Sequence, residues 1–536
     1  MYKTKINKKF NPSNSNYMKY LPVITLLLLM SLSILPIISF AQSGSLDLSF
    51  GSNGIATCHS SSVALISSSM AIQSDGKIIV AGSSWTSANV NSIALARFNN
   101  SGILDSSFGN NGIVITHIGY SNVGISVAIQ TDGKILVSGY VTNSSIIDEN
   151  FSLVRYNSSG NLDSTFGTNG IIMTDFGTLY DCGYSIFMQS DGKIIVAGQG
   201  SNSSTYDFAM ARYKNNGSLD STFGLNGKII TDLLGYNDFA KSVYIQNDGK
   251  ILIAGHSNNG TLYPFSLVRY TNSGMIDSTF DGDGIVITQI ANTNYNGIVT
   301  VQNDGKILLA GQVGNTLTPG FIGGLIRYNI NGGIDSTFDN DGIVTTAIGN
   351  DFRIESITLQ NNGKIIVAGY IKDTFNILHI ALVRYRSNGI LDSTFDSDGI
   401  VITSSGSSAN YYGKAVALQN DGKILVAGDS NDTDFLVARY TEDNSTQIQD
   451  PTSTSLITFS PNPFINSVVL NSNTNLKNAV VTIYDLTGRL VEQIDNINGQ
   501  TITLQLNILP AGIFIAQLKE NNKTLFIEKL LIKVIN

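Results

Sequence analysis

Cysteine and charged residues are scarce in this chain of 536 residues. Charged side chains make up 13% of it, about half the usual share. The two cysteines, Cys58 and Cys182, stand at non-equivalent positions of non-neighbouring sequence repeats, which disfavours the short Cα separation of a disulfide. We therefore expect two free thiols and a fold that is stabilised by its apolar core.

Histidine is also rare, and common catalytic motifs are missing. The four histidines are His59, His117, His256 and His379, and none has the His-x-x-x-His spacing of a zinc enzyme. The Gly-x-Ser-x-Gly elbow of α/β hydrolases is absent too. No metal or other cofactor is therefore indicated by a motif, although an enzyme that gathers its site from distant repeats stays an alternative.

The net charge argues against two classes of partner. It is −8 in total, and the first 41 residues contain five lysines and no acid, so the remainder of the chain carries −13. Repulsion between like charges disfavours nucleic acid and anionic membranes as partners.

A long hydrophobic run occurs once, near the N-terminus. Residues 21–40 are apolar, follow the basic segment and end in Ser39-Phe40-Ala41, which has the small residues of a signal-peptidase site. This predicts a signal peptide over residues 1–41; a single membrane anchor is the alternative reading. Met18 as the true start would give a shorter, more usual basic region.

Three markers recur seven times, at steps of 56–59 residues for the first of them. Such a fixed period is the signature of a repeat architecture. Gln-x-Asp/Asn-Gly-Lys turns end at Lys77, Lys134, Lys193, Lys250, Lys306, Lys364 and Lys423. Leu/Ile-Asp-x-Ser/Thr-Phe segments have their aspartates at Asp47, Asp105, Asp163, Asp220, Asp277, Asp335 and Asp392. Arg-Tyr/Phe pairs have their arginines at Arg97, Arg155, Arg212, Arg269, Arg327, Arg384 and Arg439.

Each repeat contains four strand-length runs rich in β-branched residues. In the second repeat these are residues 112–116, 125–130, 134–139 and 151–156, and a hairpin-forming Asp-Gly pair joins the second to the third. Seven such units predict an all-β, seven-bladed β-propeller with four antiparallel strands per blade, over residues 44–440. An open β-solenoid is disfavoured because each unit has its own hairpins and no capping repeat is visible. A closed ring leaves no free sheet edge, and we expect a monomer.

The repeats stop before the C-terminal segment. Residues 441–455 are polar and aperiodic and are read as a linker. Residues 456–536 contain alternating strands, such as residues 479–484 and 501–506, which predict a small β-sandwich.

This C-terminal segment resembles the type A C-terminal sorting domain of the type IX secretion system. The resemblance rests on Ser-Pro-Asn-Pro-Phe at 460–464, Tyr-Asp-Leu-Thr-Gly-Arg-Leu-Val at 484–491, Ala-Gly-Ile-Phe at 511–514 and Lys-Leu-Leu-Ile-Lys at 529–533. Ser460 and Phe514 stand where that family often has tyrosine. The resemblance implies Sec export and then handling by the type IX machinery, with a secreted or outer-surface location.

The seven repeats resemble the delta-60 repeat family, in their Leu-Asp-x-x-Phe-Gly, Gln-x-Asp-Gly-Lys, Ala-Gly and Ala-Arg-Tyr segments. That resemblance implies a propeller fold and no activity. The recurring Lys and Arg are interpreted as structural, with each arginine pairing with the nearby Leu-Asp aspartate.

Connectivity predicts which face of the ring recognises a ligand. Successive antiparallel connections alternate between faces, so we expect the Asp-Gly turns and the Leu-Asp-x-Ser/Thr-Phe segments, read as interblade crossovers, to share one face. The variable loops would occupy the other, where recognition usually occurs. Its aromatic residues are the candidate ligand contacts: Trp85, Tyr120, Tyr180, Tyr236, Tyr295 and Tyr411.

These residues predict an exported binding module for an extracellular glycan or polymer, because aromatic rings stack on sugars. A secreted hydrolase or lyase and a purely structural surface component are the alternatives. Alternating carboxylates before glycine resemble part of a calcium loop, but the full twelve-residue loop is absent and polar turns are the preferred reading. These residues are Asp281, Asp283, Asp339, Asp341, Asp396 and Asp398.

Overall fold

The computed structural model describes most of the chain from residue 43 onward. The described residues are 43–86, 90–143, 148–177, 180–201, 205–314, 320–405, 409–442, 457–460, 467–485, 489–506, 512–520 and 523–532. They form strands and turns and contain no helix, so no membrane-spanning helix is found among them. The predicted signal peptide and most of the predicted linker lie outside these residues.

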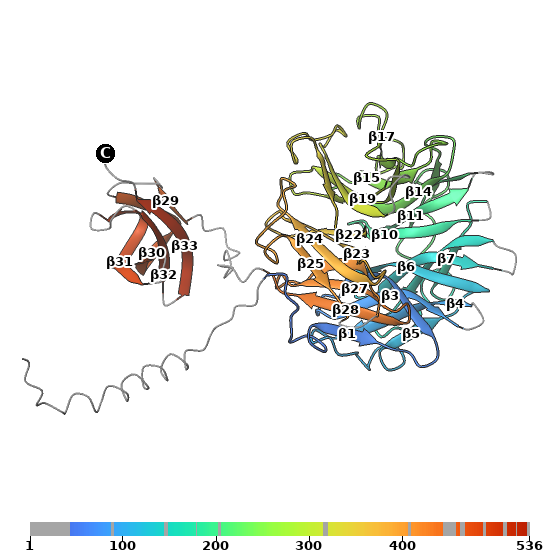
Figure 1. Cartoon of the computed structure of the whole chain (residues 1–536), viewed down its shortest axis with the longest axis horizontal. Helices are drawn as coiled ribbons and strands as arrows, with labels where there is room; N and C mark the ends of the chain where they lie inside the picture. The colour runs from blue at the N-terminus through green and yellow to red at the C-terminus, as the bar shows by residue number, and fades with distance from the viewer. Residues whose placement is uncertain are drawn as a thin grey trace, which may run out of the picture. The chain divides into compact units, whose positions relative to one another are not determined.

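The first 28 strands form seven antiparallel sheets of four strands, arranged as the blades of a propeller (Figure 1). The seven innermost strands contact one another in sequence around the ring. They are β2 (Ala64–Ile72), β6 (Ser121–Ile129), β10 (Cys182–Met188), β14 (Asp238–Ile245), β18 (Thr293–Val301), β22 (Asp351–Leu359) and β26 (Tyr411–Leu418). The second strands are β3 (Ile78–Trp85), β7 (Ile135–Thr142), β11 (Ile194–Ser201), β15 (Ile251–Ser257), β19 (Ile307–Gly314), β23 (Ile365–Lys372) and β27 (Ile424–Ser430).

Two further strands complete each blade toward the outside. The third strands are β4 (Asn91–Phe98), β8 (Glu149–Tyr156), β12 (Tyr206–Tyr213), β16 (Phe265–Tyr270), β20 (Phe321–Tyr328), β24 (Leu378–Tyr385) and β28 (Asp434–Tyr440). The outer strands are β5 (Ile113–Thr116), β9 (Ile171–Thr174), β13 (Lys228–Thr231), β17 (Ile285–Thr288), β21 (Ile343–Thr346), β25 (Ile400–Thr403) and, in the last blade, β1 (Ile55–Cys58). Blades are numbered from the one that contains β2, so blade 7 contains β26, β27, β28 and β1.

The ring is closed by strands from opposite ends of the repeat region. β1 pairs with β28, with Ile55 opposite Ala438 and Cys58 opposite Phe435. The seventh blade therefore combines three C-terminal strands with one N-terminal strand, and the sheet edge that β28 would otherwise expose is covered.

One prediction about connectivity is wrong. The Leu-Asp-x-Ser/Thr-Phe segment does not cross between blades: it joins the third strand to the outer strand of the same blade, as β4 to β5. The segment folds back on itself, because the Asp105 N–H donates to the Arg97 carbonyl and the Arg97 N–H donates to the Gly112 carbonyl. The true crossover is the following loop, from an outer strand to the next inner strand.

The apolar core lies between the blades. Seven clusters of buried side chains each combine residues of two adjacent blades, including β1 with blades 7 and 1. The second and third strands of a blade are buried on both faces, as in the run from Ile78 to Gly82. This explains their continuous apolar sequence, since a middle strand packs against a neighbouring blade on each side.

The Asp-Gly turns and the Leu-Asp segments share one face, the turn face, as predicted. In each blade the repeat arginine donates from Nε to the repeat aspartate over 2.7–2.9 Å, as Arg155 does to Asp163. The repeat lysine approaches the same carboxylate, as Lys134 does at 3.5 Å. Arg155 also donates to the Asn215 carbonyl of the next blade and lies over the Phe166 ring. The structural reading of these residues is confirmed.

The C-terminal strands form a separate five-stranded sheet. Its strands are β29 (Ile457–Ser460), β30 (Ser467–Tyr484), β31 (Leu490–Gln505), β32 (Gly512–Glu520) and β33 (Lys523–Ile532). β30 pairs with β31 along most of its length, with register shifts after Asn471 and Leu476. The sheet encloses its own core, which includes Val481 and Leu518. The domain predicted as a small β-sandwich is all-β as expected, and its five strands belong to one continuous hydrogen-bonded sheet.

Candidate functional site

A β-bulge recurs at the same place in every inner strand. The register shifts opposite the Ala-Gly pair of the second strand, for example between Gly124 and Ser126. A Cβ on Gly139 would collide with the Val123 carbonyl, so glycine is required at this close approach. The bulge re-aims one side chain of each inner strand.

The bulge residues differ from blade to blade, whereas the surrounding markers repeat. They are Ser68, Ile125, Tyr184, Lys241, the pair Asn296-Gly297, Glu355 and Lys414. The residue directly after the Ala-Gly pair of each second strand also varies, and these seven residues form a second ring of variable positions. They are Ser83, Tyr140, Gln199, His256, Gln312, Tyr370 and Asp429. Symmetry is therefore broken around the inner end of the blades.

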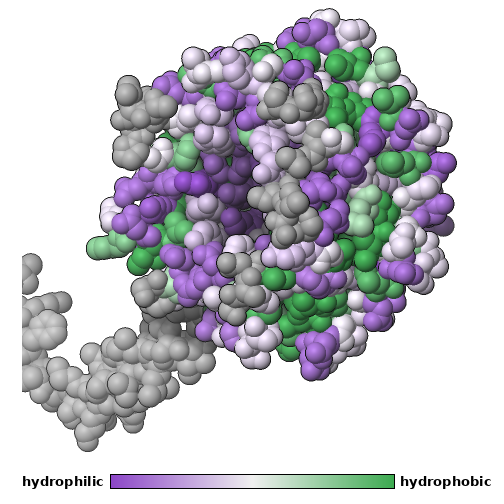
Figure 2. Space-filling view, turned by 90° about the vertical axis from the view of Figure 1, so that its right-hand side faces the viewer, coloured by the Kyte–Doolittle hydropathy of each residue, from purple (hydrophilic) through white to green (hydrophobic). Residues whose placement is uncertain are grey.

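Four consecutive blades, 3 to 6, enclose a cavity of about 450 Å³ at this level. Its walls are Tyr184, Gln199, Phe239, Lys241, His256, Tyr295, Asn296, Gln312, Phe321, Arg353 and Glu355. The face that carries the second-to-third-strand loops and the crossovers is called the loop face. Figure 2 looks onto the loop face and shows hydrophilic side chains around a central hollow. The cavity has the size of a small-ligand site.

Lys241 is the central cation of this cavity. Its ammonium nitrogen lies 3.7 Å from the centre of the Tyr184 ring. Within the described part of the chain, no carboxylate oxygen lies within 4 Å of it. Burial lowers the pKa of Lys241, and the charge of Glu355 opposes that effect.

Two more cations lie on inner strands farther around the ring, Arg353 on β22 and Lys414 on β26. Lys414 approaches the rings of Tyr370 and Tyr412, at 5.1 and 5.3 Å. Arg353 donates to Asp351 at 3.0 Å and lies over the Phe321 ring. Arg353 is thus compensated by Asp351, whereas Lys241 has no carboxylate oxygen within 4 Å in the described structure.

Glu355 is the one acidic residue among the cavity walls. Its carboxylate accepts hydrogen bonds from the Asn296 amide at 3.1 Å and the Gln312 amide at 3.5 Å. Burial raises the pKa of Glu355, while the charges of Lys414, Arg353 and Lys241 lower it. Glu355 fixes the orientation of two amide side chains in the cavity wall.

His256 is a buried, neutral imidazole in the cavity wall. Its ring stacks on Phe239 and meets Tyr295 edge-on, with both ring centres 5.0 Å away. Burial, and then the charge of Lys241, lower the pKa of His256 to about 3. His256 Nδ1 has no hydrogen-bond partner in the described structure.

Both cysteines are free, as predicted, and the structure shows that both are buried. Cys182 lies at the start of β10, and its thiol donates to Glu149 Oε2 at 3.1 Å. Burial and the adjacent Glu149 carboxylate raise its pKa well above the usual range. Cys182 is therefore a protonated thiol and a poor nucleophile.

The predicted ligand residues do not converge on one point. Tyr295 lies in the cavity wall, beside Tyr263 and Phe321. Tyr180 packs edge-on against Tyr206, and Tyr411 packs on the core between blades 6 and 7. The other three are exposed on the loop face: Trp85, Tyr120 and Tyr236.

The calcium candidates are turn residues in this structure. Asp283, Asp341 and Asp398 each accept a backbone N–H two residues later at 2.8 Å, which makes polar Asx turns. Their partners in the motif adopt positive φ: Asp281, Asp339 and Asp396. None of the six belongs to the one group of three close ligand atoms found among the described residues.

Sequence reasoning missed the bulge ring and the ring after Ala-Gly. The signal that could have found them is variability at one repeat position. Lys241, Glu355 and Lys414 are charged, whereas the other repeats have Ser, Ile, Tyr or Asn-Gly at this position. Charged residues at inner-strand positions are unexpected in a purely structural repeat.

Comparison with known families agrees with this architecture. Residues 73–108, 130–166, 189–223, 246–280, 360–395 and 419–445 match the family described as "Domain of unknown function (DUF5122) beta-propeller". Residues 458–533 match the "Secretion system C-terminal sorting domain". The chain carries a DUF5122 β-propeller and a type IX sorting domain. No curated protein sequence matches the chain.

Solved structures that resemble this DUF5122 propeller protein have varied functions. Virginiamycin B lyase from Staphylococcus aureus is 13% identical, with a TM-score of 0.43, over 72% of this chain and 99% of that one. An ulvan lyase of polysaccharide lyase family PL25 is 11% identical, with a TM-score of 0.44, over 72% and 96%. Drosophila Semaphorin 1b is 10% identical, with a TM-score of 0.37, over 74% and 87%. Likeness at this level does not carry a function.

Proposed function

We propose that this secreted or surface propeller binds an acidic extracellular polysaccharide in the cavity of blades 3 to 6. The single observation that carries the proposal is the environment of Lys241. The seven repeat lysines on the turn face all pair with an aspartate, at 2.8–3.5 Å. Lys241 lies in a cavity wall without such a partner in the described structure.

A sugar carboxylate or sulfate would supply the missing counter-charge. Charge-assisted hydrogen bonds are strong where solvent is reduced, and Arg353 lies in the same wall. Tyr184, Phe239 and Tyr295 offer ring faces and edges, while three amide side chains can exchange hydrogen bonds with hydroxyl groups: Gln199, Asn296 and Gln312. Export to the cell surface brings the protein to such polymers.

A hydrolase is disfavoured by the composition of the cavity wall. Glycoside hydrolysis usually needs two carboxyl groups that flank the scissile bond. Glu355 is the one carboxyl group in the wall, and Arg353, Lys241 and Lys414 act on it electrostatically.

A lyase is a second candidate, favoured by the neutral His256 near Lys241. A cation on a uronate carboxylate acidifies the proton on the adjacent carbon. A base can then remove that proton as the C–O bond to the leaving sugar breaks and a C=C bond forms. His256 is unprotonated above its lowered pKa and its Nδ1 has no partner in the described structure, but the lowered pKa also makes this nitrogen a weak base, which ranks the lyase below the binding module.

The test compares acidic and neutral polysaccharides on the full chain and on Lys241→Met. We expect binding to uronate- or sulfate-containing polymers, with affinity falling as salt rises. Loss of a charge-assisted contact of about 1.5–3 kcal/mol lowers affinity roughly 10- to 100-fold. Lys193→Met is the matched control, because Lys193 pairs with Asp220 and Asp191 on the turn face.

Three outcomes separate the hypotheses. Binding without product supports the binding module, and a rise in ultraviolet absorbance from a new C=C bond supports the lyase. Equal affinity of Lys241→Met and the unaltered protein would place binding outside this cavity, and no binding to any acidic polymer would leave the structural alternative. Either result would overturn the proposal.

A further inference from the structure

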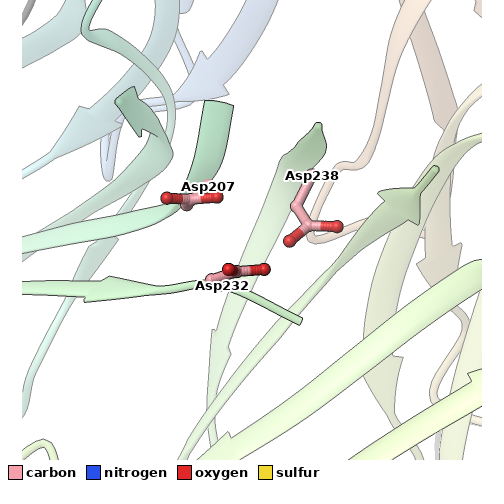
Figure 3. Close-up of side chains that lie close together, drawn as sticks. All are labelled: Asp207, Asp232 and Asp238. Atoms are coloured by element: carbon pink, nitrogen blue, oxygen red, sulfur yellow. The ribbon is translucent and has the colours of Figure 1, made fainter. Parts of the chain in front are cut away.

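Three carboxylates from two adjacent blades meet on the loop face (Figure 3). Asp207 lies on β12 of blade 3, Asp238 begins β14 of blade 4, and Asp232 lies in the crossover between these blades. One oxygen from each carboxylate lies within 4.8 Å of the others. Asp207 and Asp238 are 0% exposed, whereas Asp232 is exposed.

Two of the buried oxygens have no partner. Asp207 Oδ1 accepts from the Thr205 hydroxyl at 3.3 Å, and Asp238 Oδ2 accepts from the Leu233 N–H at 2.8 Å. Asp207 Oδ2 and Asp238 Oδ1 accept no hydrogen bond in the described structure. Nor does any Lys, Arg or His among the described residues lie within 4 Å of the three carboxylates. Buried charges without a counter-charge are costly, so this arrangement calls for a cation.

The same three positions in the other blades show that the fold does not need these acids. The junction of blades 2 and 3 has Asn150, Asp175 and Asp181 at these positions. The junction of blades 1 and 2 has Ser92, His117 and Asn122. Ser92 and His117 hydrogen-bond each other at 3.1 Å, and His59 pairs with Asp434 at the closing junction. Asn122 caps Ile118 N–H just as Asp238 caps Leu233 N–H. A neutral amide therefore serves the structural role of Asp238, and the charge itself is left unexplained.

We propose that Asp207, Asp232 and Asp238 form a divalent-cation site, with Ca²⁺ as the cation. All donors are carboxylate oxygens, the ligands that hard cations prefer. Ligand distances of about 2.3–2.6 Å around Ca²⁺ allow two ligands to be up to about 5 Å apart, which accommodates the 4.8 Å spread. Mg²⁺ holds its ligands at about 2.0–2.1 Å and requires a tighter cluster. The exposed side of Asp232 leaves room for water to complete the coordination.

The crowding of like charges agrees with this assignment. Burial, together with Asp232, raises the pKa of Asp207 to about 6. Burial, together with the charges of Asp207 and Asp232, raises the pKa of Asp238 to about 7, against the hydrogen bond from the Leu233 N–H. A bound cation would fix the start of β14, where Phe239 follows directly and lies in the cavity wall.

The test titrates calcium chloride into metal-free full-length protein. We expect one saturable site by calorimetry, a rise in melting temperature with calcium, and a smaller rise with magnesium. Terbium(III) should bind there too, with luminescence sensitised by Tyr206, and calcium should displace it. Asp207→Asn, which copies Asn150 of blade 2, should weaken calcium binding at least 10-fold.

Two comparisons keep the proposal falsifiable if a variant is less stable. Asp175→Asn alters the equivalent exposed residue of the preceding junction and should leave calcium binding unchanged. In chelator, Asp207→Asn and Asp238→Asn should be at least as stable as the unaltered protein, because each removes a repelling charge. No calcium or terbium response in the unaltered protein, or an equal response in Asp207→Asn, would overturn the site.

Discussion

The Lys241 ammonium lies 3.7 Å from the centre of the Tyr184 ring, and the two residues belong to the β-bulges of adjacent inner strands. A cation over an aromatic face is favourable, but it leaves the net charge of the ammonium uncompensated. The two residues are among the bulge residues that differ from blade to blade. Tyr295 lines the same cavity, so one ligand can meet both a cation and aromatic rings there.

Tyr295→Ala and Tyr236→Ala should differ in both stability and binding. Tyr295 is half-buried among His256, Tyr263 and Phe321, so its loss should lower the free energy of unfolding by roughly 2 kcal/mol. It should also weaken acidic-polymer binding at least 10-fold. Tyr236 is 49% exposed and lies outside the cavity wall, and its loss should change stability by less than about 0.5 kcal/mol.

Urea unfolding and calorimetric binding measure these two effects. Tyr295→Phe is the matched control, because it keeps the ring and removes the hydroxyl. Strong loss of binding in Tyr236→Ala with none in Tyr295→Ala would place recognition on the outer loops, away from the cavity.

Asp47→Ala should be more damaging than Asp105→Ala, although the two aspartates have the same local partners. Asp47 accepts from Arg439 Nε at 2.9 Å, and Asp105 accepts from Arg97 Nε at 2.9 Å. Each loss leaves a buried arginine unpaired and should cost roughly 3–5 kcal/mol. Asp47 also holds β1 against β28 across 392 residues of sequence, so its loss should expose a sheet edge and promote self-association.

Size-exclusion chromatography and urea unfolding of both variants check this prediction, and equal self-association of the two variants would contradict it.

The stability of the protein in acid gives a second check on Asp47. Burial would raise the pKa of Asp47, but the hydrogen bonds from Ser49 and Lys423 and the charge of Arg439 bring it down to about 2. Since this lies below the usual value, the stabilisation is present above about pH 4 and is lost as pH falls toward 2.

Asp429 should make the propeller less stable as pH rises from about 4 to about 7. Burial raises its pKa to about 7, against hydrogen bonds from Ser67 and the charge of Lys414, while Asp432 raises it further. Because the folded pKa lies above the unfolded one, the unfolded state loses its proton first. This group's contribution is complete below about pH 4 and falls by roughly 1.4 kcal/mol per pH unit up to pH 7.

Asp429→Asn keeps an oxygen for the Ser67 N–H and removes the titration. Unfolding free energies of the two proteins should therefore diverge between pH 5 and pH 8, with the asparagine variant more stable at pH 8. The same difference at both pH values would contradict the assignment.

Deletion of residues 456–536 should block export and leave the propeller folded. The seven blades close through β1 and β28, and the C-terminal sheet has its own core. We expect the product of residues 42–455 to stay in the periplasm, with the near-ultraviolet spectrum and melting temperature of the full chain's propeller. Immunoblots of periplasm and medium measure this, and the truncated product outside the cell would contradict the sorting role.

The sequence alone determined the features that depend on local pattern and on periodicity. Six Asp-Gly turns and one Asn-Gly turn specified seven hairpins, and strand alternation placed those turns on one face with the Leu-Asp segments. The pairing of Arg155 with Asp163 also follows from the repeat, since every blade has both residues at the same spacing. The sequence pattern led to a wrong connection for the Leu-Asp segment, which was read as a crossover between blades. Its return to the same blade depends on hydrogen bonds such as that from the Arg97 N–H to the Gly112 carbonyl.

The tertiary structure decided which non-repeating residues meet. Tyr184, Lys241 and Glu355 are more than fifty residues apart in sequence, and no motif links them. They line one cavity because seven inner strands converge on an axis and each bulge re-aims one side chain. Asp207 and Asp238 likewise belong to different blades and meet through the packing of the blade 3–4 junction. The periodic sequence determines the structure that every blade shares. The packing of the blades around one axis determines which of the non-repeating residues meet.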